Sequence, residues 1–242
     1  MKAIILAAGI ASRLRPLTND RPKCLLKIGD RSLLERTIDA LLENNIREII
    51  IVTGYLHDML ETFVQTRYPS LNVKFIHNEL YSSTNNIYSL WLALPKVLQE
   101  KEIILLDSDI LFDPLMIKIL LDASHDNCLA LDSHKLGEEE IKVIVNERNQ
   151  ITEISKTCSI EKAIGESIGI EKMSHAYLLA LHEHMILHEK LDNVFYELAF
   201  ERLIARGQYF YPVDTSAYFS MELDTPEDFH DAMNRIPKHL QA

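Results

Sequence analysis

Residues 2–25 read KAIILAAGIASRLRPLTNDRPKCL, and this stretch decides how the rest of the chain is interpreted. Residues 2–7 are almost entirely apolar, which predicts a short strand buried on both faces of a sheet. The alanines and the glycine that follow allow backbone amides to approach an anion closely. A loop rich in Arg, Pro and Lys then continues to residue 27. The stretch therefore predicts a strand followed by a candidate phosphate-binding loop.

The next part of the chain alternates between helix and strand patterns. Ser32 and Glu35 form a capping-box pattern, and apolar residues at helical spacing follow it. Further strands are predicted at residues 48–53, 71–76 and 102–106, and further helices at 57–67 and 87–98, where Pro95 bends or ends the helix. Such alternation is typical of a parallel, doubly wound sheet.

The second half has a different pattern. Residues 141–145 and 151–155 flank a turn-rich segment and predict a hairpin. Helices are predicted at 175–189 and 194–206, short strands at 209–213 and 217–221, and a last helix from Pro226. We expect a single α/β domain over residues 1–242: a doubly wound, mostly parallel, Rossmann-like sheet with a small antiparallel C-terminal extension.

Composition limits the function classes. The 242 residues carry a net charge of −11, which argues against a nucleic-acid or anionic-membrane partner. The apolar runs are too short to cross a bilayer, and three widely spaced cysteines predict neither a disulfide framework nor a zinc site. We therefore expect a cytoplasmic protein, for which a homo-oligomer stays open.

Two cations stand in the first loop. Arg13 can form charge-assisted hydrogen bonds to phosphate oxygens, and Lys23 follows on a segment stiffened by Pro22. Transfer from a triphosphate needs such positive charge, because negative charge moves onto the pyrophosphate. The loop is neither a P-loop nor a dinucleotide glycine motif. An ordinary strand–loop with surface cations is the alternative interpretation.

Acidic residues follow the strand at 102–106 and recur near the end of the chain. Asp107 and Asp109 lie where a parallel strand ends, facing the ligand crevice of such a sheet. Glu222 and Asp224, in MELDTPED (residues 221–228), share one face if the strand continues through them. Carboxylates of this kind bind Mg²⁺ together with substrate phosphates. A turn at the first site and a helix start at Asp224 are the alternatives.

Residues 6–25, LAAGIASRLRPLTNDRPKCL, resemble the signature of the superfamily of sugar-phosphate and cytidylyl nucleotidyltransferases, with Ala11 where that superfamily usually has glycine. The resemblance implies that Arg13 and Lys23 bind phosphates and stabilise the transition state. It also implies that Asp109 and Asp224 bind Mg²⁺. Further nucleotide contacts are implied for Leu6, Ala7, Ala8, Gly9 and Ser12.

The segment NNIYSL, residues 85–90, is similar to one found in members that use CTP and act on phosphocholine, aminoethylphosphonate or inositol phosphate. This resemblance implies that Asn86 and Ser89 lie beside the nucleotide. Asparagine also supplies the donors and acceptors that a base edge requires. The same residues suit an N-capped helix start, and both roles can hold together.

Acceptor residues are also implied by resemblance. Lys156 is a candidate for the acceptor's phosphate and Glu166 for a hydroxyl or amine, with Glu222 nearby. Tyr196, next to Glu197, is a candidate aromatic face for a choline-like group. Leu198 stands where the phosphocholine-like pattern has Asp, which weakens a cationic acceptor.

Together these patterns predict a Mg²⁺-dependent enzyme that transfers CMP from CTP to a small phosphorylated or phosphonylated, phosphocholine-like acceptor and releases pyrophosphate. A sugar-1-phosphate nucleotidyltransferase that uses another triphosphate is the nearest alternative. A catalytically silent nucleotide-binding regulator is the second, and retention of Arg13, Lys23, Asp109 and Asp224 argues against it. A dinucleotide oxidoreductase lacks its glycine fingerprint here.

Overall fold

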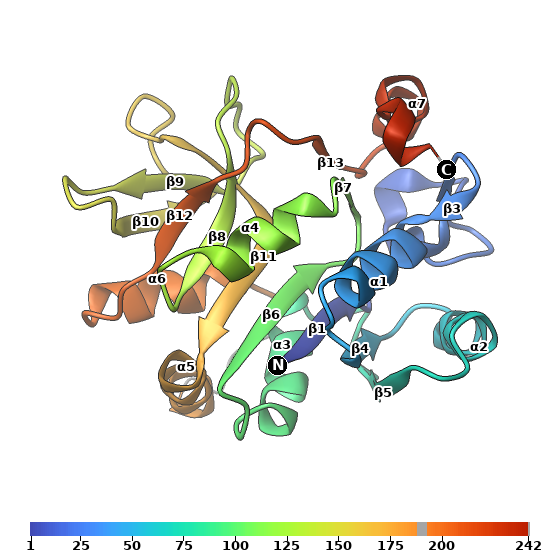
Figure 1. The fold of residues 1–242 in the computed structure, drawn as a ribbon, viewed down its shortest axis with the longest axis horizontal. Coiled ribbons are helices and arrows are strands. Elements are labelled where there is room, and N and C mark those ends of the chain that lie inside the picture. Colours follow the sequence, from blue (N-terminus) through green and yellow to red (C-terminus); the bar gives the residue numbers. More distant parts are fainter. Residues whose placement is uncertain (188–192, 242) are drawn as a thin grey trace.

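A nine-stranded mixed sheet forms the centre of the molecule in the computed structural model, which describes residues 1–187 and 193–241 (Figure 1). Its strands follow the order β10-β9-β11-β6-β1-β4-β5, and β8 joins the sheet beside β11 and carries β12. Two-stranded pairs form between β13 and β7 and between β2 and β3. The strands are β1 (Lys2–Ala7), β2 (Lys27–Ile28), β3 (Arg31–Ser32), β4 (Glu48–Thr53), β5 (Asn72–His77), β6 (Glu102–Asp107), β7 (Ile110–Phe112), β8 (Cys128–Asp132), β9 (Lys142–Val145), β10 (Ile151–Ser155), β11 (Gly165–Ser174), β12 (Tyr211–Asp214) and β13 (Ser220–Glu222).

Helices connect and cover these strands. The α-helices are α1 (Leu33–Glu43), α2 (His57–Arg67), α3 (Asn86–Ala93), α4 (Leu115–Asp122), α5 (His175–Leu187), α6 (Glu197–Ala205) and α7 (Pro226–Arg235). Four short 3-10 helices are η1 (Ser12–Leu14), η2 (Lys23–Leu25), η3 (Leu94–Lys96) and η4 (Lys238–Leu240). No helix in the described part of the chain combines the length and apolar character needed to cross a membrane.

The predicted α/β fold with a doubly wound, mostly parallel sheet is confirmed. The four strands β5, β4, β1 and β6 are parallel neighbours, and β11 pairs antiparallel with β6. The hairpin of β9 and β10 continues the same sheet through β11. The antiparallel part is thus an extension of one sheet, within which β12 runs parallel to β8.

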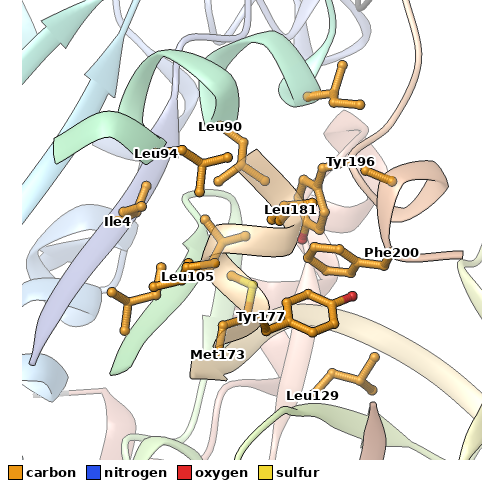
Figure 2. Packing of buried hydrophobic residues seen from close by; sticks show 14 of the residues in the cluster. Ile4, Leu90, Leu94, Leu105, Leu129, Met173, Tyr177, Leu181, Tyr196 and Phe200 are labelled. Carbon is orange, nitrogen blue, oxygen red and sulfur yellow. The ribbon is translucent and has the colours of Figure 1, made fainter. Parts of the chain in front are cut away.

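Alternating side chains of the central strands supply two hydrophobic cores, one on each face of the sheet. Ile4 and Leu105 belong to the core that α3, α5 and α6 cover, which Figure 2 shows. Ile5 and Leu106, their neighbours in sequence, belong to the core covered by α1, α2 and α4. This arrangement places helices on both sides of the sheet (Figure 1).

Differences from the predicted elements have local causes. Helix α3 ends at Ala93, earlier than the predicted 87–98, because a 3-10 turn containing Pro95 follows it. The short elements β7, α4 and β8, between residues 110 and 132, were not predicted. Of the helix predicted at 175–189, residues 188 and 189 lie outside the described residues.

A third, smaller core ties the end of the chain to its beginning. Ala232 of α7 and Ile236, just after this helix, share a core with Ile28 of β2 and with Leu33, the first residue of α1. Arg36 strengthens this contact by donating hydrogen bonds to the backbone carbonyls of Ile28 and Leu240. The segment carrying Glu222 and Asp224 is therefore fixed beside the loop that carries Lys23.

Candidate active site

A cleft of about 450 Å³ opens at the carboxyl ends of the parallel strands β1 and β6. The loop after β1, residues 8–13, forms one wall of the cleft, and residues 107–110, from the last residue of β6 to the first of β7, also line it. Strand β11, the starts of α3 and α6, and residues 222 and 224 at and after the end of β13 also line the cleft. This is the edge at which open α/β sheets bind their ligands.

The loop after β1 is held by its own hydrogen bonds. Ala11 adopts a left-handed conformation with φ 51° and ψ 50°. Its carbonyl accepts hydrogen bonds from the Leu14 amide (3.1 Å) and the Thr18 hydroxyl (2.9 Å), while the Ala8 carbonyl accepts one from the Tyr55 amide (3.1 Å). The left-handed backbone gives a physical reason for the glycine usually found at this position in the family signature.

Lys23 joins the two acidic residues that the sequence placed far apart. Its Nζ lies 2.8 Å from Asp109 Oδ2 and 2.7 Å from Asp224 Oδ1. Arg13 contacts the other oxygen of Asp224 at 2.5 Å. Burial disfavours the Lys23 ammonium, but the two carboxylates outweigh it and hold the pKa of Lys23 above its ordinary value. The predicted cations and acids thus meet at one point of the cleft.

Asp109, Glu222 and Asp224 form a compact carboxylate group. Each offers one oxygen, and these three oxygens lie within 4.8 Å of one another. The antiparallel pairing of β13 with β7 sets Glu222 opposite Ile110, and the Leu223 amide donates to the Asp109 carbonyl at 3.1 Å. A backbone contact between residues far apart in the chain therefore builds this group.

The start of α7 orients Asp224. Thr225 is the N-cap residue, and its hydroxyl accepts from the Asp228 amide in a capping box. The Asp228 carboxylate in turn accepts from the backbone amides of Asp224 (3.0 Å) and Thr225 (2.7 Å). The helix-start interpretation of this segment is confirmed, and the same cap presents Asp224 to the cleft.

Charge in the carboxylate group is unevenly compensated. Desolvation, followed by repulsion from Asp109 and Asp224, raises the pKa of Glu222 to about 8. Desolvation opposes the charge of Asp224 too, but Lys23 and Arg13 outweigh it and lower the pKa of Asp224. Excess negative charge on closely spaced oxygen donors fits a hard divalent cation such as Mg²⁺.

All the residues predicted to bind the nucleotide line this cleft: Leu6, Ala7, Ala8, Gly9, Ser12, Arg13, Lys23, Asn86 and Ser89. Asn85 caps α3 with its side chain, so the helix-cap interpretation holds as well. Asn86 Oδ1 accepts from the Tyr196 amide (3.0 Å), and Ser89 Oγ accepts from Asn78 (3.1 Å). These bonds fix α3 against the cleft.

Three of the four predicted acceptor residues also line the cleft: Lys156, Glu166 and Glu222. Lys156 Nζ lies 3.3 Å from Glu139 and 5.1 Å from the centre of the Phe195 ring. Glu166 Oε2 lies 2.7 Å from His134 Nε2, so its charge has a partner within the protein.

The interpretation of Tyr196 as an aromatic face for the acceptor has to be corrected. Its side chain is fully buried, and its ring packs on Phe200 with 5.2 Å between the ring centres (Figure 2). Its hydroxyl lies 3.1 Å from both Asp107 Oδ2 and Glu171 Oε1. Tyr196 therefore supports the floor of the cleft from within the core.

Several lining residues were not among the predicted site residues, among them Asn78, Thr84 and Ser108, and Gly169 of β11 lines the cleft as well. Gly169 has φ +73°, and a Cβ atom there would lie 2.6 Å from Asp107 Oδ2. Strand β11 thus approaches Asp107 so closely that a side chain would displace it. A glycine inside a strand pattern was the available signal.

Comparison with known proteins supports the family that the sequence resembles. The family described as nucleotidyl transferase matches residues 2–131. A CTP:phosphoglutamine cytidylyltransferase from Campylobacter jejuni is 30% identical over 207 residues, which cover 80% of this chain and 79% of that protein. A choline-phosphate cytidylyltransferase from Streptococcus pneumoniae is 42% identical over 93 residues, 38% of this chain and 39% of that protein.

Solved structures share the fold. A CTP:phosphocholine cytidylyltransferase from Streptococcus pneumoniae superposes with a TM-score of 0.83 at 21% identity, covering 98% of this chain and 99% of that one. An inositol-1-phosphate CTP transferase from T. maritima gives a TM-score of 0.80 at 22% identity, covering 98% and 96%. At these identities the likeness concerns the fold of the whole described chain.

Proposed function

The chain belongs to the nucleotidyl transferase family and is an enzyme of that type, and we propose that it transfers CMP from CTP to a small phosphorylated or phosphonylated acceptor with release of pyrophosphate. One observation carries the proposal: Lys23 lies between Asp109 and Asp224 in the cleft that the loop after β1 forms. CTP is chosen because relatives named as cytidylyltransferases, one of them as a CTP:phosphoglutamine cytidylyltransferase, match this chain.

The proposed reaction is an in-line displacement at phosphorus. An oxygen of the acceptor's phosphate or phosphonate attacks the α-phosphorus of CTP, and the bond from that phosphorus to the bridging oxygen of pyrophosphate breaks. The attacking group is already an anion near neutral pH, so no general base is needed. Catalysis then rests on positioning and on positive charge near the leaving group.

Lys23 and Arg13 are suited to supply that charge. Both cations contact carboxylate oxygens in this structure, and both lie beside the loop of Gly9 and Ser12. A phosphate oxygen offers them the same charge-assisted hydrogen bonds as a carboxylate oxygen. We propose that each exchanges a carboxylate oxygen for a phosphate oxygen when the triphosphate binds, so that each cation has an anionic partner before and after binding.

Asp109, Glu222 and Asp224 would hold the magnesium ion of the proposed reaction. When bound, such an ion neutralises charge on the phosphate oxygens and orients them. The protein's own part is to hold three carboxylates close together, by the β7–β13 pairing and by the N-terminal cap of α7.

A pyrophosphate-release assay tests the proposal. CTP, UTP, GTP and dTTP are each supplied with Mg²⁺ to the full chain, together with phosphocholine, phosphoethanolamine, aminoethylphosphonate, inositol phosphate or a sugar phosphate. We expect release with CTP, loss of release in EDTA, and at least a 100-fold loss in Asp109→Asn. Asp122→Asn, an exposed residue on α4 paired with Lys118, is the matched control and keeps full activity. Preference for another triphosphate would overturn the choice of CTP.

A further inference from the structure

Two buried polar atoms in the lining of the cleft have no hydrogen-bond partner within residues 1–187 and 193–241. One is Oε2 of Glu197, the first residue of α6, whose side chain belongs to a residue only 5% exposed. The other is Oγ of Ser167 on β11, in a residue 6% exposed. Both residues line the cleft. Buried polar atoms are normally paired, so two unpaired ones in a binding cleft point to a ligand.

More acidic groups lie behind Glu197. Asp107 and Glu171 are joined through the hydroxyl of Tyr196, and Oε2 of Glu171 is also buried without a partner in the described chain. Burial, followed by repulsion from Glu197, raises the pKa of Glu171. Burial also raises the pKa of Glu197 to about 7. This floor of the cleft therefore favours a ligand that brings positive charge.

Neighbouring cations compensate the negative charge of this floor only in part. Lys156 acts against the rise in the pKa of Glu197, but its Nζ contacts Glu139 and lies over the Phe195 ring. His134 is paired with Glu166. Glu166, the residue that the sequence suggested for a hydroxyl or amine, thus has a partner within the protein, whereas Oε2 of Glu197 has no hydrogen-bond partner in the described chain.

The missing partner must therefore donate hydrogen bonds and carry a positive charge. A primary ammonium group does both, because it has three N–H donors. A quaternary ammonium group has no donor and relies on aromatic faces. Phe195 offers its face to Lys156, Tyr196 is buried in the core, and Tyr81 packs near His77 on the nucleotide side. Hydroxyl groups of a polyol donate hydrogen bonds but leave the charge of the floor uncompensated.

We propose that the acceptor carries a primary ammonium group as well as its phosphate or phosphonate, and that Glu197 and Ser167 bind this ammonium. The inference rests on the proposed function, since it concerns the acceptor of the same cleft. It identifies Glu197 as a specificity-determining residue that separates primary amines from choline-like and polyol acceptors.

A methylation series on the unmodified protein tests this directly. Phosphoethanolamine and its mono-, di- and trimethylated forms, the last being phosphocholine, are compared as acceptors with CTP and Mg²⁺. Each methyl group removes one donor while the charge stays, so we expect kcat/KM to fall stepwise, by about 10- to 100-fold over the series. Inositol phosphate should be at least as poor as phosphocholine. Equal or faster turnover of phosphocholine or inositol phosphate would overturn the inference.

Two variants assign the effect to residues. Glu197→Gln keeps the shape and removes the charge, and we expect kcat/KM for phosphoethanolamine to fall about 10- to 100-fold with the KM for CTP within about twofold. Ser167→Ala should give a smaller loss in the same direction. Glu201→Gln, on the same helix but outside the cleft lining, is the matched control. An unchanged amine preference in Glu197→Gln, with the fold intact by circular dichroism, would contradict the assignment.

The outcomes of the two proposals are distinguishable. If CTP gives no pyrophosphate with any acceptor, the proposed function fails and the inference fails with it. If CTP is used but phosphocholine or inositol phosphate is preferred, the proposed function stands and only the ammonium assignment is overturned.

Discussion

Removing the Lys23 ammonium should expose the cost of gathering three carboxylates in one cleft. In Lys23→Met the chain keeps a side chain of similar length but loses both ion pairs, at 2.8 Å to Asp109 and 2.7 Å to Asp224. Asp109, Glu222 and Asp224, whose oxygens lie within 4.8 Å of one another, then keep Arg13 as their ion-pair partner among the described residues. We expect the folded state without metal to be destabilised.

The size of the loss follows from the exposure of the three side chains. Lys23 is 11% exposed, and Asp109 and Asp224 are 25% and 27% exposed. Exposed pairs contribute at most about 1 kcal/mol each, while breaking a fully buried pair costs about 3–5 kcal/mol. Two partly exposed pairs should together contribute about 2–3 kcal/mol. For a chain of this length the melting temperature should fall by about 4–12 °C.

Thermal unfolding in EDTA and in Mg²⁺ measures this loss. Lys23 occupies the space between carboxylates that would bind the ion, so it competes with Mg²⁺ in the free enzyme. Mg²⁺ should therefore raise the melting temperature of Lys23→Met more than that of the unmodified chain. Arg21→Met, which removes an exposed pair with Asp20 in the same loop, is the control and should behave like the unmodified chain in both buffers. A Lys23→Met variant as stable as the unmodified chain in EDTA would refute the reasoning.

Three further predictions concern other parts of the molecule. Ala11→Gly should stabilise the chain by about 1 kcal/mol in urea denaturation, because glycine adopts the left-handed conformation without steric cost; a loss of stability would contradict this. Glu35→Gln should lower the free energy of unfolding by about 1 kcal/mol at pH 7. Desolvation opposes the charge of Glu35, but hydrogen bonds from Ser32 and the pair with Arg67 outweigh it and lower the pKa, so the full loss should appear above the ordinary pKa and vanish as the pH falls through the lowered pKa. A loss of stability that does not change with pH would count against this. Lys142→Met should raise the KM for the acceptor several-fold and leave the KM for CTP unchanged. The buried Lys142 ammonium donates hydrogen bonds to the carbonyls of residues 137, 138 and 140, which lie beside the proposed acceptor end of the cleft. Equal effects on both KM values would argue for a general structural role.

Local patterns predicted the strand that leads into the phosphate loop and a neighbouring strand of the sheet. The apolar runs at residues 2–7 and 48–53 became β1 and β4 with the same bounds, because a strand buried on both faces needs a continuous apolar run. The capping box at Ser32 was also predictable, since its residues are only three apart. In contrast, β7 has three residues and forms through its pairing with β13, more than a hundred residues away, so no local pattern announces it.

The site shows the same division between residue identity and geometry. The resemblance to a known family identified Arg13, Lys23, Asp109 and Asp224 as site residues. Only the fold shows that the Lys23 ammonium lies between the two aspartates. Tyr196 shows that residue type alone can suggest a role that the fold does not allow. Its residue type suits an acceptor face, yet its position just before α6 turns the ring into the core, and a sequence does not reveal which way an aromatic ring points.

Tracing the α-phosphorus of CTP tests the central claim most directly. CTP labelled at the α-phosphate is incubated with the enzyme, Mg²⁺ and a phosphorylated primary amine, and the products are separated. The account predicts that the label enters a CDP-linked product in equal amount to the unlabelled pyrophosphate released. Label recovered in free CMP or CDP, with the acceptor unchanged, would contradict it.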